Sequence, residues 1–124
     1  MTVGLASGIV NNWLDTDFAT ASLFVKLHTA DPGSAGATAA AAGSTTRVQA
    51  TMAAASAGSK AMTSMASSWT NGGTSETLTH ISLWSASSAG TFKGSAALSA
   101  SQAWVSTNTF SLTSLSVAIT PIAA

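Results

Sequence analysis

The residues that could perform acid–base chemistry in this chain are few. They are two histidines and four carboxylates in a serine-rich chain: His28, His80, Asp15, Asp17, Asp31 and Glu76. These residue types occur together in Ser–His–Asp sites, but no Gly-x-Ser-x-Gly motif presents a nucleophilic serine. We therefore predict no catalytic residue. A small hydrolase that uses either histidine beside a serine and an acid stays open as an alternative.

Glu76 and His80 have the spacing of metal ligands on one face of a helix. The apolar–polar alternation around them predicts a strand instead, in which residues four apart lie about 13 Å from each other. We therefore predict no metal site, and we expect His80 to hydrogen-bond a neighbouring loop or an adjacent subunit. The chain has no cysteine, which excludes disulfides and thiolate metal sites. No cofactor is predicted.

The basic residues Lys26 and Arg47 are expected to pair with Asp31 or Asp17. Two interpretations stay open: a surface ion pair contributing less than about 1 kcal/mol, or one buried pair that fixes register or a subunit contact. The tryptophans also allow two uses, as core and interface residues or as a stacking platform for sugars. They are Trp13, Trp69, Trp84 and Trp104.

The low charge of the chain limits its partners. Only four acidic and four basic residues occur among 124, and the formal net charge is zero. Soluble domains usually carry about a quarter charged residues, and near-zero net charge favours association. The chain has no basic patch for nucleic acid and no apolar run of about 18 residues to span a membrane. We expect it to bury surface against copies of itself or a large assembly.

The first segment has helical spacing, because its apolar residues recur three or four positions apart: Leu5, Ile9, Val10, Trp13 and Leu14. This pattern predicts a short helix over residues 2–15, with Thr2 as N-cap and the apolar stripe docked on a sheet. A secretory signal requires Lys or Arg before its apolar residues, and none precedes the apolar residues here. We expect synthesis in the cytoplasm without a signal peptide.

Residues 22–120 are predicted to form short strands, because apolar and polar residues alternate there. The expected strands are 22–28, 46–52, 60–65, 78–84, 92–98, 103–105 and 110–119. Asp31-Pro32-Gly33 and Asn71-Gly72-Gly73 are turn signals, and 34–45 is an expected surface loop. A bulge is expected near His80. Residues 46–52 are expected at a sheet edge, where a partner can pair.

Six to eight short strands after one helix are typical of a mainly β, single-domain β-sandwich or jelly-roll-like fold. The length suits one domain over residues 1–124 with a single modest core.

Three features carry a resemblance to a known family. The segment Leu27-His28-Thr29-Ala30-Asp31-Pro32-Gly33 is similar to a Leu-Phe-Thr-x-Asp-Pro-Gly-like turn, and Leu78-Thr79-His80-Ile81-Ser82-Leu83-Trp84 is similar to Ile-Thr-His-Val-Gly-Leu-Phe. Arg47 matches an arginine near the start of the intervening strand, although Thr45 stands where an aromatic residue is usual. In these features the chain resembles a family of small bacteriophage virion proteins, usually labelled tail-fibre or minor tail proteins.

The resemblance spans nearly the whole chain and implies a non-enzymatic structural protein of the virion, with no catalytic residues to carry over. A compact chain of 124 residues has no fibre shaft, which favours a capsid-decorating subunit or a short tail component. A homo-oligomer contacting major capsid or tail proteins is expected, with a trimer as the first expectation. The alternative is a carbohydrate-binding module for host recognition, with exposed tryptophans in a groove.

Overall fold

The computed structural model describes residues 3–123, which form one helix and eight strands. In chain order they are α1 (Ser7–Asp17), β1 (Leu23–His28), β2 (Val48–Met52), β3 (Ser59–Met65), β4 (Trp69–Thr70), β5 (Glu76–Trp84), β6 (Phe92–Trp104), β7 (Thr109–Phe110) and β8 (Ser116–Ala118).

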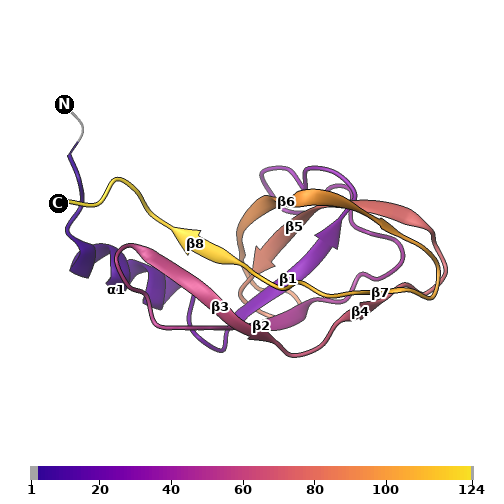
Figure 1. The fold of residues 1–124 in the computed structure, drawn as a ribbon, viewed down its shortest axis with the longest axis horizontal. Coiled ribbons are helices and arrows are strands. Elements are labelled where there is room, and N and C mark those ends of the chain that lie inside the picture. The colour runs from indigo at the N-terminus through magenta and orange to yellow at the C-terminus, as the bar shows by residue number, and fades with distance from the viewer. Residues whose placement is uncertain (1–2, 124) are drawn as a thin grey trace.

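Six strands form one antiparallel sheet in the order β6-β5-β1-β2-β3-β8, and β4 pairs with β7 in a separate two-stranded ribbon. The sheet curls, so that β6 and β8 at its two edges lie on the same side of the molecule (Figure 1). The predicted mainly β fold with one short N-terminal helix is confirmed. Its layers come largely from the curling of a single sheet.

The helix begins later than the sequence indicates, at Ser7 instead of residue 2, with Ala6 as its N-cap. The expected N-cap Thr2 lies outside the described residues. Val10 and Leu14 are buried, whereas Ile9 and Trp13 are exposed. The prediction that the whole apolar stripe docks on the sheet is therefore wrong. Neighbouring helix positions differ by about 100°, and α1 lies mainly along one strand, β3, which covers only one side of the helix.

Most predicted strands are present, and the expected bulge near His80 is confirmed by the register shift between Leu78 and His80. The single strand expected over 110–119 is wrong, because β7 and β8 are separate strands that pair with β4 and β3. The separation of 92–98 from 103–105 is wrong, because β6 runs unbroken from Phe92 to Trp104. Leu78 pairs with Gln102 and His80 with Ala97, so β6 has more residues than β5 between these pairs and accommodates them as a bulge within the strand. The short strand β4 was not predicted.

The edge position expected for residues 46–52 is also wrong, because β2 lies between β1 and β3. Its partners on both sides leave β6 and β8 as the edges of the sheet. The alternation that predicted β2 reports which side chains are buried, but it does not report the strand order.

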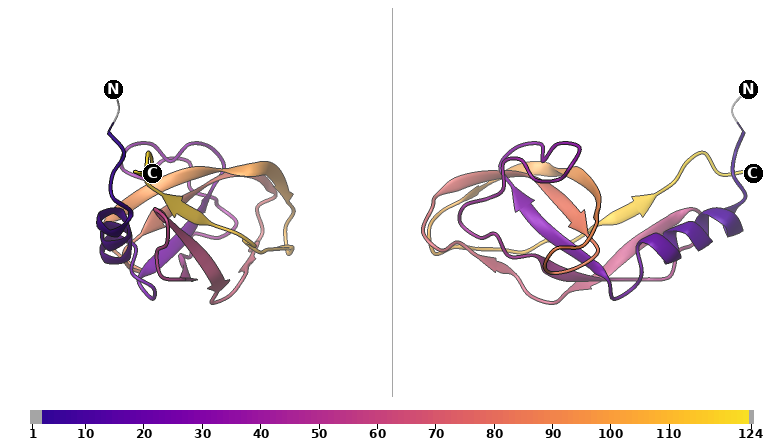
Figure 2. Two further views of the ribbon diagram at one scale, coloured as in Figure 1. Left: turned by 60° about the vertical axis from the view of Figure 1, so that its left-hand side comes forward. Right: turned by 180° about the vertical axis from the view of Figure 1, so that it is seen from behind.

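The molecule has two regions, shown in Figures 1 and 2. The head contains the main core cluster, formed by the curled sheet and the ribbon. Its largest buried side chains, Trp69 and Trp104, donate their indole N–H groups to the carbonyls of Thr46 and Asn108 at 2.9 and 3.1 Å. The arm comprises residues 3–17, 55–61 and 116–123, and it extends away from the head.

Candidate functional site

A buried hydrogen-bond network links β1 to β5 in the head. The Nε2 atom of His28 lies 2.7 Å from the Ser82 hydroxyl, and the indole N–H of Trp84 donates to the same hydroxyl at 2.8 Å. The Nδ1 atom of His28 lies 2.8 Å from the carbonyl oxygen of Thr38. A carbonyl only accepts, so Nδ1 carries the proton, and the Ser82 hydroxyl donates to Nε2.

This network brings together the serine and the histidine that a hydrolase would need, but in the wrong setting. His28 and Ser82 are both 0% exposed, so no substrate reaches the hydroxyl. The third partner is a backbone carbonyl, whereas a catalytic triad places a carboxylate there to stabilise the imidazolium. Burial lowers the pKa of His28 from its ordinary value of 6.5, which keeps the ring neutral. The arrangement holds the loop after β1 against β5.

Arg47 extends this network to the surface. Its guanidinium lies 3.8 Å from the centroid of the Trp84 ring, and it donates to the carbonyls of Ala86 and Ala89 at 3.0 and 2.6 Å. The predicted pairing of Arg47 with Asp31 or Asp17 is therefore wrong. The planar guanidinium can stack on an aromatic face while it binds two carbonyls. Arg47 thereby fixes the loop between β5 and β6.

Glu76 and His80 have separate structural roles. The two carboxylate oxygens of Glu76 accept the backbone N–H groups of Ala42 and Gly43 at 3.2 and 2.8 Å. His80 Nδ1 lies 2.8 Å from the hydroxyl of Thr79, its neighbour in the strand. The partner of His80 is thus in its own strand, and not in the neighbouring loop that the sequence suggested. Within residues 3–123 no three His, Asp or Glu side chains come together as metal ligands.

The remaining acids lie apart from the histidines. Asp31 accepts the N–H of Gly33 at 2.8 Å and closes the turn after β1. Asp17 on α1 lies 3.9 Å from the ammonium of Lys93, a long and exposed contact of little energetic weight.

One ion pair is partly buried, and sequence reasoning missed one of its members. The Lys60 ammonium donates to Asp15 Oδ1 at 2.6 Å and joins β3 to α1; Lys60 is 1% exposed and Asp15 44% exposed. The hydrogen bond from Lys60 lowers the pKa of Asp15 from its ordinary value of 3.8. The interpretation of one buried pair that fixes register therefore fits this pair, and not Arg47 or Lys26. The sequence signal for this ion pair is a lysine at an inward-facing position of a strand.

The tryptophans do not form a shared platform. Trp69 and Trp104 lie in the core, and Trp84 stacks with Arg47 and contacts Phe92, with ring centroids 5.5 Å apart. Trp13 on α1 is the exception, at 46% exposure. The core interpretation holds for Trp69 and Trp104, whereas Trp84 is partly buried beneath Arg47.

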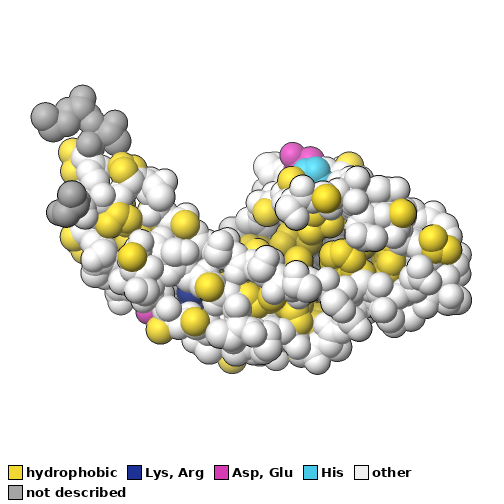
Figure 3. All heavy atoms as spheres, viewed as in Figure 1, with side chains coloured by type: hydrophobic (Ala, Val, Ile, Leu, Met, Phe, Trp, Pro, Cys, Tyr) yellow, Lys and Arg dark blue, Asp and Glu magenta, His cyan; other side chains and the backbone are white. Residues whose placement is uncertain are grey.

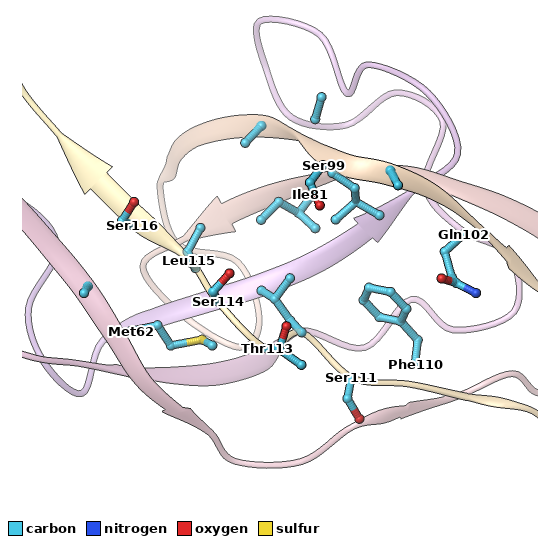
Figure 4. Close-up of a pocket in the computed structure, with 16 residues that line it drawn as sticks. Met62, Ile81, Ser99, Gln102, Phe110, Ser111, Thr113, Ser114, Leu115 and Ser116 are labelled. Atoms are coloured by element: carbon cyan, nitrogen blue, oxygen red, sulfur yellow. The ribbon is translucent and has the colours of Figure 1, made fainter.

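A groove of 610 Å³ opens on the head between β6 and residues 110–116, with β3 and β5 contributing to its lining (Figure 4). Its apolar members include Met62, Ile81, Leu98, Phe110 and Leu112, and hydroxyl side chains such as Thr113 stand beside them. None of its 16 lining residues is charged. Figure 3 shows hydrophobic side chains visible in the hollow on this face. The sequence pattern placed most of these residues in strands, left Ser99, Ala100 and Gln102 between two strands, and did not indicate the groove.

A second apolar surface lies on the arm. Val3, Ile9 and Trp13 are 73%, 51% and 46% exposed, and the other large exposed hydrophobic side chain among residues 3–123 is Val105 on the head. Ile9 and Trp13 lie four residues apart on one face of α1, and we call these two residues the α1 stripe. The one described helix is not of a length and apolarity that would let it cross a membrane.

Comparison with known proteins identifies a family for this chain. A search of curated proteins finds no match for the chain. The family model described as podophage GP4 fiber I protein gp80 matches residues 1–120, which is nearly the whole chain. This agrees with the resemblance to tail-fibre proteins carried by the turn at 27–33, the strand at 78–84 and Arg47. The chain therefore belongs to the podophage GP4 fiber I protein gp80 family, a family of phage fibre proteins.

Proposed function

We propose that this protein is a non-enzymatic accessory subunit of the phage particle, carried on the tail-fibre assembly as a homo-oligomer. The observation that carries the proposal is the fibre-family match over residues 1–120. A trimer is the proposed oligomer, since closed rotational symmetry is usual for such assemblies.

The chemistry of the head supports a structural role. The Ser82–His28 pair is fully buried and ends on a carbonyl oxygen, so its hydrogen bonds serve to join strands and loops. The proposed subunit thus uses its polar residues to fix loop positions, and it uses its exposed apolar residues for assembly.

The surface of the arm supports assembly with other subunits. An apolar stripe that includes a half-exposed tryptophan favours burial in an interface, because Trp is enriched among the residues that dominate binding energy. Asp15 and Asp17 lie at the C-terminal end of the same helix and are 44% and 65% exposed, so a partner that covers Ile9 and Trp13 would lie close to these two carboxylates.

The test is to locate the protein on purified particles. Phage particles from a lysate are separated into filled capsids and detached tails. Each fraction is analysed by mass spectrometry and by immunogold labelling with an antibody to this chain. Label on the tail fibres supports the proposal. Label spread over the capsid would instead establish capsid decoration, and absence from washed particles would refute a virion role.

A carbohydrate-binding role is the second candidate, and the groove is the observation that favours it. Phe110 lies in the groove with Gln102, Ser99 and Thr113, and an aromatic ring beside hydroxyl and amide groups suits a sugar. The buried positions of Trp69 and Trp104 remove the tryptophan platform on which this alternative first rested. Binding of host surface glycans to the intact protein, lost in Phe110→Ala, would support it.

A further inference from the structure

We infer that α1 is a docking helix, and that its exposed face binds a different protein of the particle, in an apolar groove with a basic residue at one end. This face consists of the α1 stripe, Ile9 and Trp13, together with Asp17. The inference rests on the proposed role as a virion subunit, and it names the helix that meets the neighbouring protein and the chemistry of the surface that receives it.

The three residues of this face follow one another along the helix. Ile9, Trp13 and Asp17 are spaced four residues apart, so their side chains lie on successive turns of one side of α1. They are 51%, 46% and 65% exposed. Two apolar anchors at helical spacing, followed by a charge, suit a helix that lies in a groove of another protein.

α1 is attached to its own chain through a different side. Val10 and Leu14 are buried, and the Lys60 ammonium on β3 donates to Asp15 at 2.6 Å. The stripe cannot turn inward without breaking these contacts. A molecule from outside the chain is therefore needed to cover Ile9 and Trp13.

Asp17 is a carboxylate with little compensation inside the chain. It is the last residue of α1, where the helix dipole disfavours an anion, and no basic residue lies in that turn. The Lys93 ammonium lies 3.9 Å away, which makes the pair weak in this exposed position. A Lys or Arg at the end of a partner's groove would complement this charge while the groove covers the stripe.

The charge of Asp17 also discriminates among partners. Nucleic acids and anionic lipid surfaces would bring further negative charge to this carboxylate. The groove beside β6 in a second copy would supply no cation, because none of its lining residues is charged. Lys60 and Arg47 already bind Asp15 and two loop carbonyls. A different protein, with an apolar groove and a basic residue, therefore fits this face best.

The experiment measures how much of the full-length protein enters particles. A phage that lacks the gene for this chain is grown in cells that supply one variant at a time, and the chain in washed particles is quantified by mass spectrometry. The test variants are Trp13→Asp, Ile9→Gln and Asp17→Lys. Val105→Asp is a control that places a charge on an exposed apolar residue of the head. Lys93→Gln is a second control, which removes the contact to Asp17 but keeps the carboxylate. Circular dichroism checks that each purified variant folds.

We expect both controls to enter particles at the wild-type level. Trp13→Asp should lower incorporation about tenfold or more, because a buried aromatic anchor dominates the energy of such a contact. Ile9→Gln should lower it less, because it removes the smaller anchor. Asp17→Lys should lower incorporation severalfold, and Asp17→Asn should have a weaker effect, because it removes the attraction without adding repulsion.

A crosslink then identifies the surface that receives α1. p-Benzoylphenylalanine in place of Trp13, photoactivated in intact particles, should attach the chain to a different virion protein, near a Lys or Arg of that protein. The same group in place of Val105 is the control and should not give this product. Replacement of the basic residue by Glu should restore the incorporation of Asp17→Lys.

Three results would overturn the inference and leave the virion role intact. They are wild-type incorporation of folded Trp13→Asp and Asp17→Lys, a crosslink from position 13 to a second copy of this chain, and a crosslink yield no higher than that from position 105. Absence of the wild-type chain from washed particles would instead refute the proposed function, and the inference with it.

Discussion

The head and the arm are held together by different kinds of interaction. The head contains a contiguous cluster of buried residues from five strands and one loop residue, Ala41, with Trp69 packed against Phe110 at 6.0 Å between ring centroids. In the arm, two buried residues, Val10 and Leu14, lie outside that cluster, and polar contacts from Asp15 and Asn11 supply much of the attachment. Core burial makes the head the more stable region, whereas the arm depends on a few specific contacts.

The same comparison explains where the exposed apolar side chains lie. A curled sheet encloses its apolar face, but a helix laid on one strand covers only part of its own circumference. The arm thus exposes Ile9 and Trp13, while the head leaves one apolar opening, the groove beside β6. Each region therefore leaves apolar side chains uncovered in the single chain.

The largest effect is expected from Trp69→Ala, which tests whether the head carries the global stability. Trp69 is buried and donates to the Thr46 carbonyl. Truncation of a buried tryptophan costs about 3–5 kcal/mol, so the free energy of unfolding measured in urea should fall by that amount. A loss below about 1 kcal/mol would contradict the assignment of the core to this side chain.

A smaller loss is expected from Ser82→Ala, which removes the hydroxyl shared by His28 and Trp84. A buried nitrogen on each ring then loses its partner, at a cost of about 1–3 kcal/mol for each unsatisfied group. The unfolding free energy is measured as before. Thr79→Ala, which removes a hydroxyl from His80 in the same strand, is the matched control and should have a smaller effect.

A local effect is expected from Asp15→Asn, which tests whether the arm opens independently of the head. The substitution leaves the ammonium of Lys60 buried without its anion, so the contact between α1 and β3 weakens. Hydrogen exchange at the amides of Ala55, Gly58 and Ile119 should become faster, while amides of β1 and β5 keep their protection. Equal acceleration in both regions would show that head and arm unfold as one unit.

The smallest changes in stability are expected from a change of pH. The head and the arm should lose stability in different pH ranges. Because the pKa of His28 is lower in the folded protein than its ordinary 6.5, the unfolded chain binds the proton more tightly. Stability of the head should therefore be complete above about pH 6.5 and should decrease as the pH falls below it. Urea midpoints between pH 8 and 5 measure this, and His80→Gln should retain the dependence while His28→Gln loses it.

The arm should respond in a lower pH range. The pKa of Asp15 is depressed from 3.8, so the stability that it contributes is present above about pH 3.8 and is lost as the pH falls below that value. Exchange at Ala55 measured between pH 5 and 3, corrected for the intrinsic pH dependence of exchange, should show this loss, and Asp15→Asn should not.

Much of this fold follows from local pattern. Alternation of apolar and polar residues predicted β1, β2 and β5, because the side-chain period of a strand matches a half-buried surface. Two turns also follow from residue type. The Pro-Gly turn after β1 places Gly33 at a φ of 74°. In the turn at Asn71, the Asn71 side chain accepts the N–H groups of Gly73 and Thr74. The fibre family could also be recognised from short motifs in these same segments.

Only the tertiary structure decided which residues meet. Strand order made β2 an inner strand, and the register of β1 on β5 placed His28 beside Ser82 instead of an acid. The placement of α1 on β3 buried Val10 and Leu14 and left Ile9 and Trp13 exposed. The periodicity and composition of the sequence determine which side chains are apolar and lie on one face of an element. The contacts that bury these side chains join residues far apart in sequence, and the local pattern carries no information about those pairs.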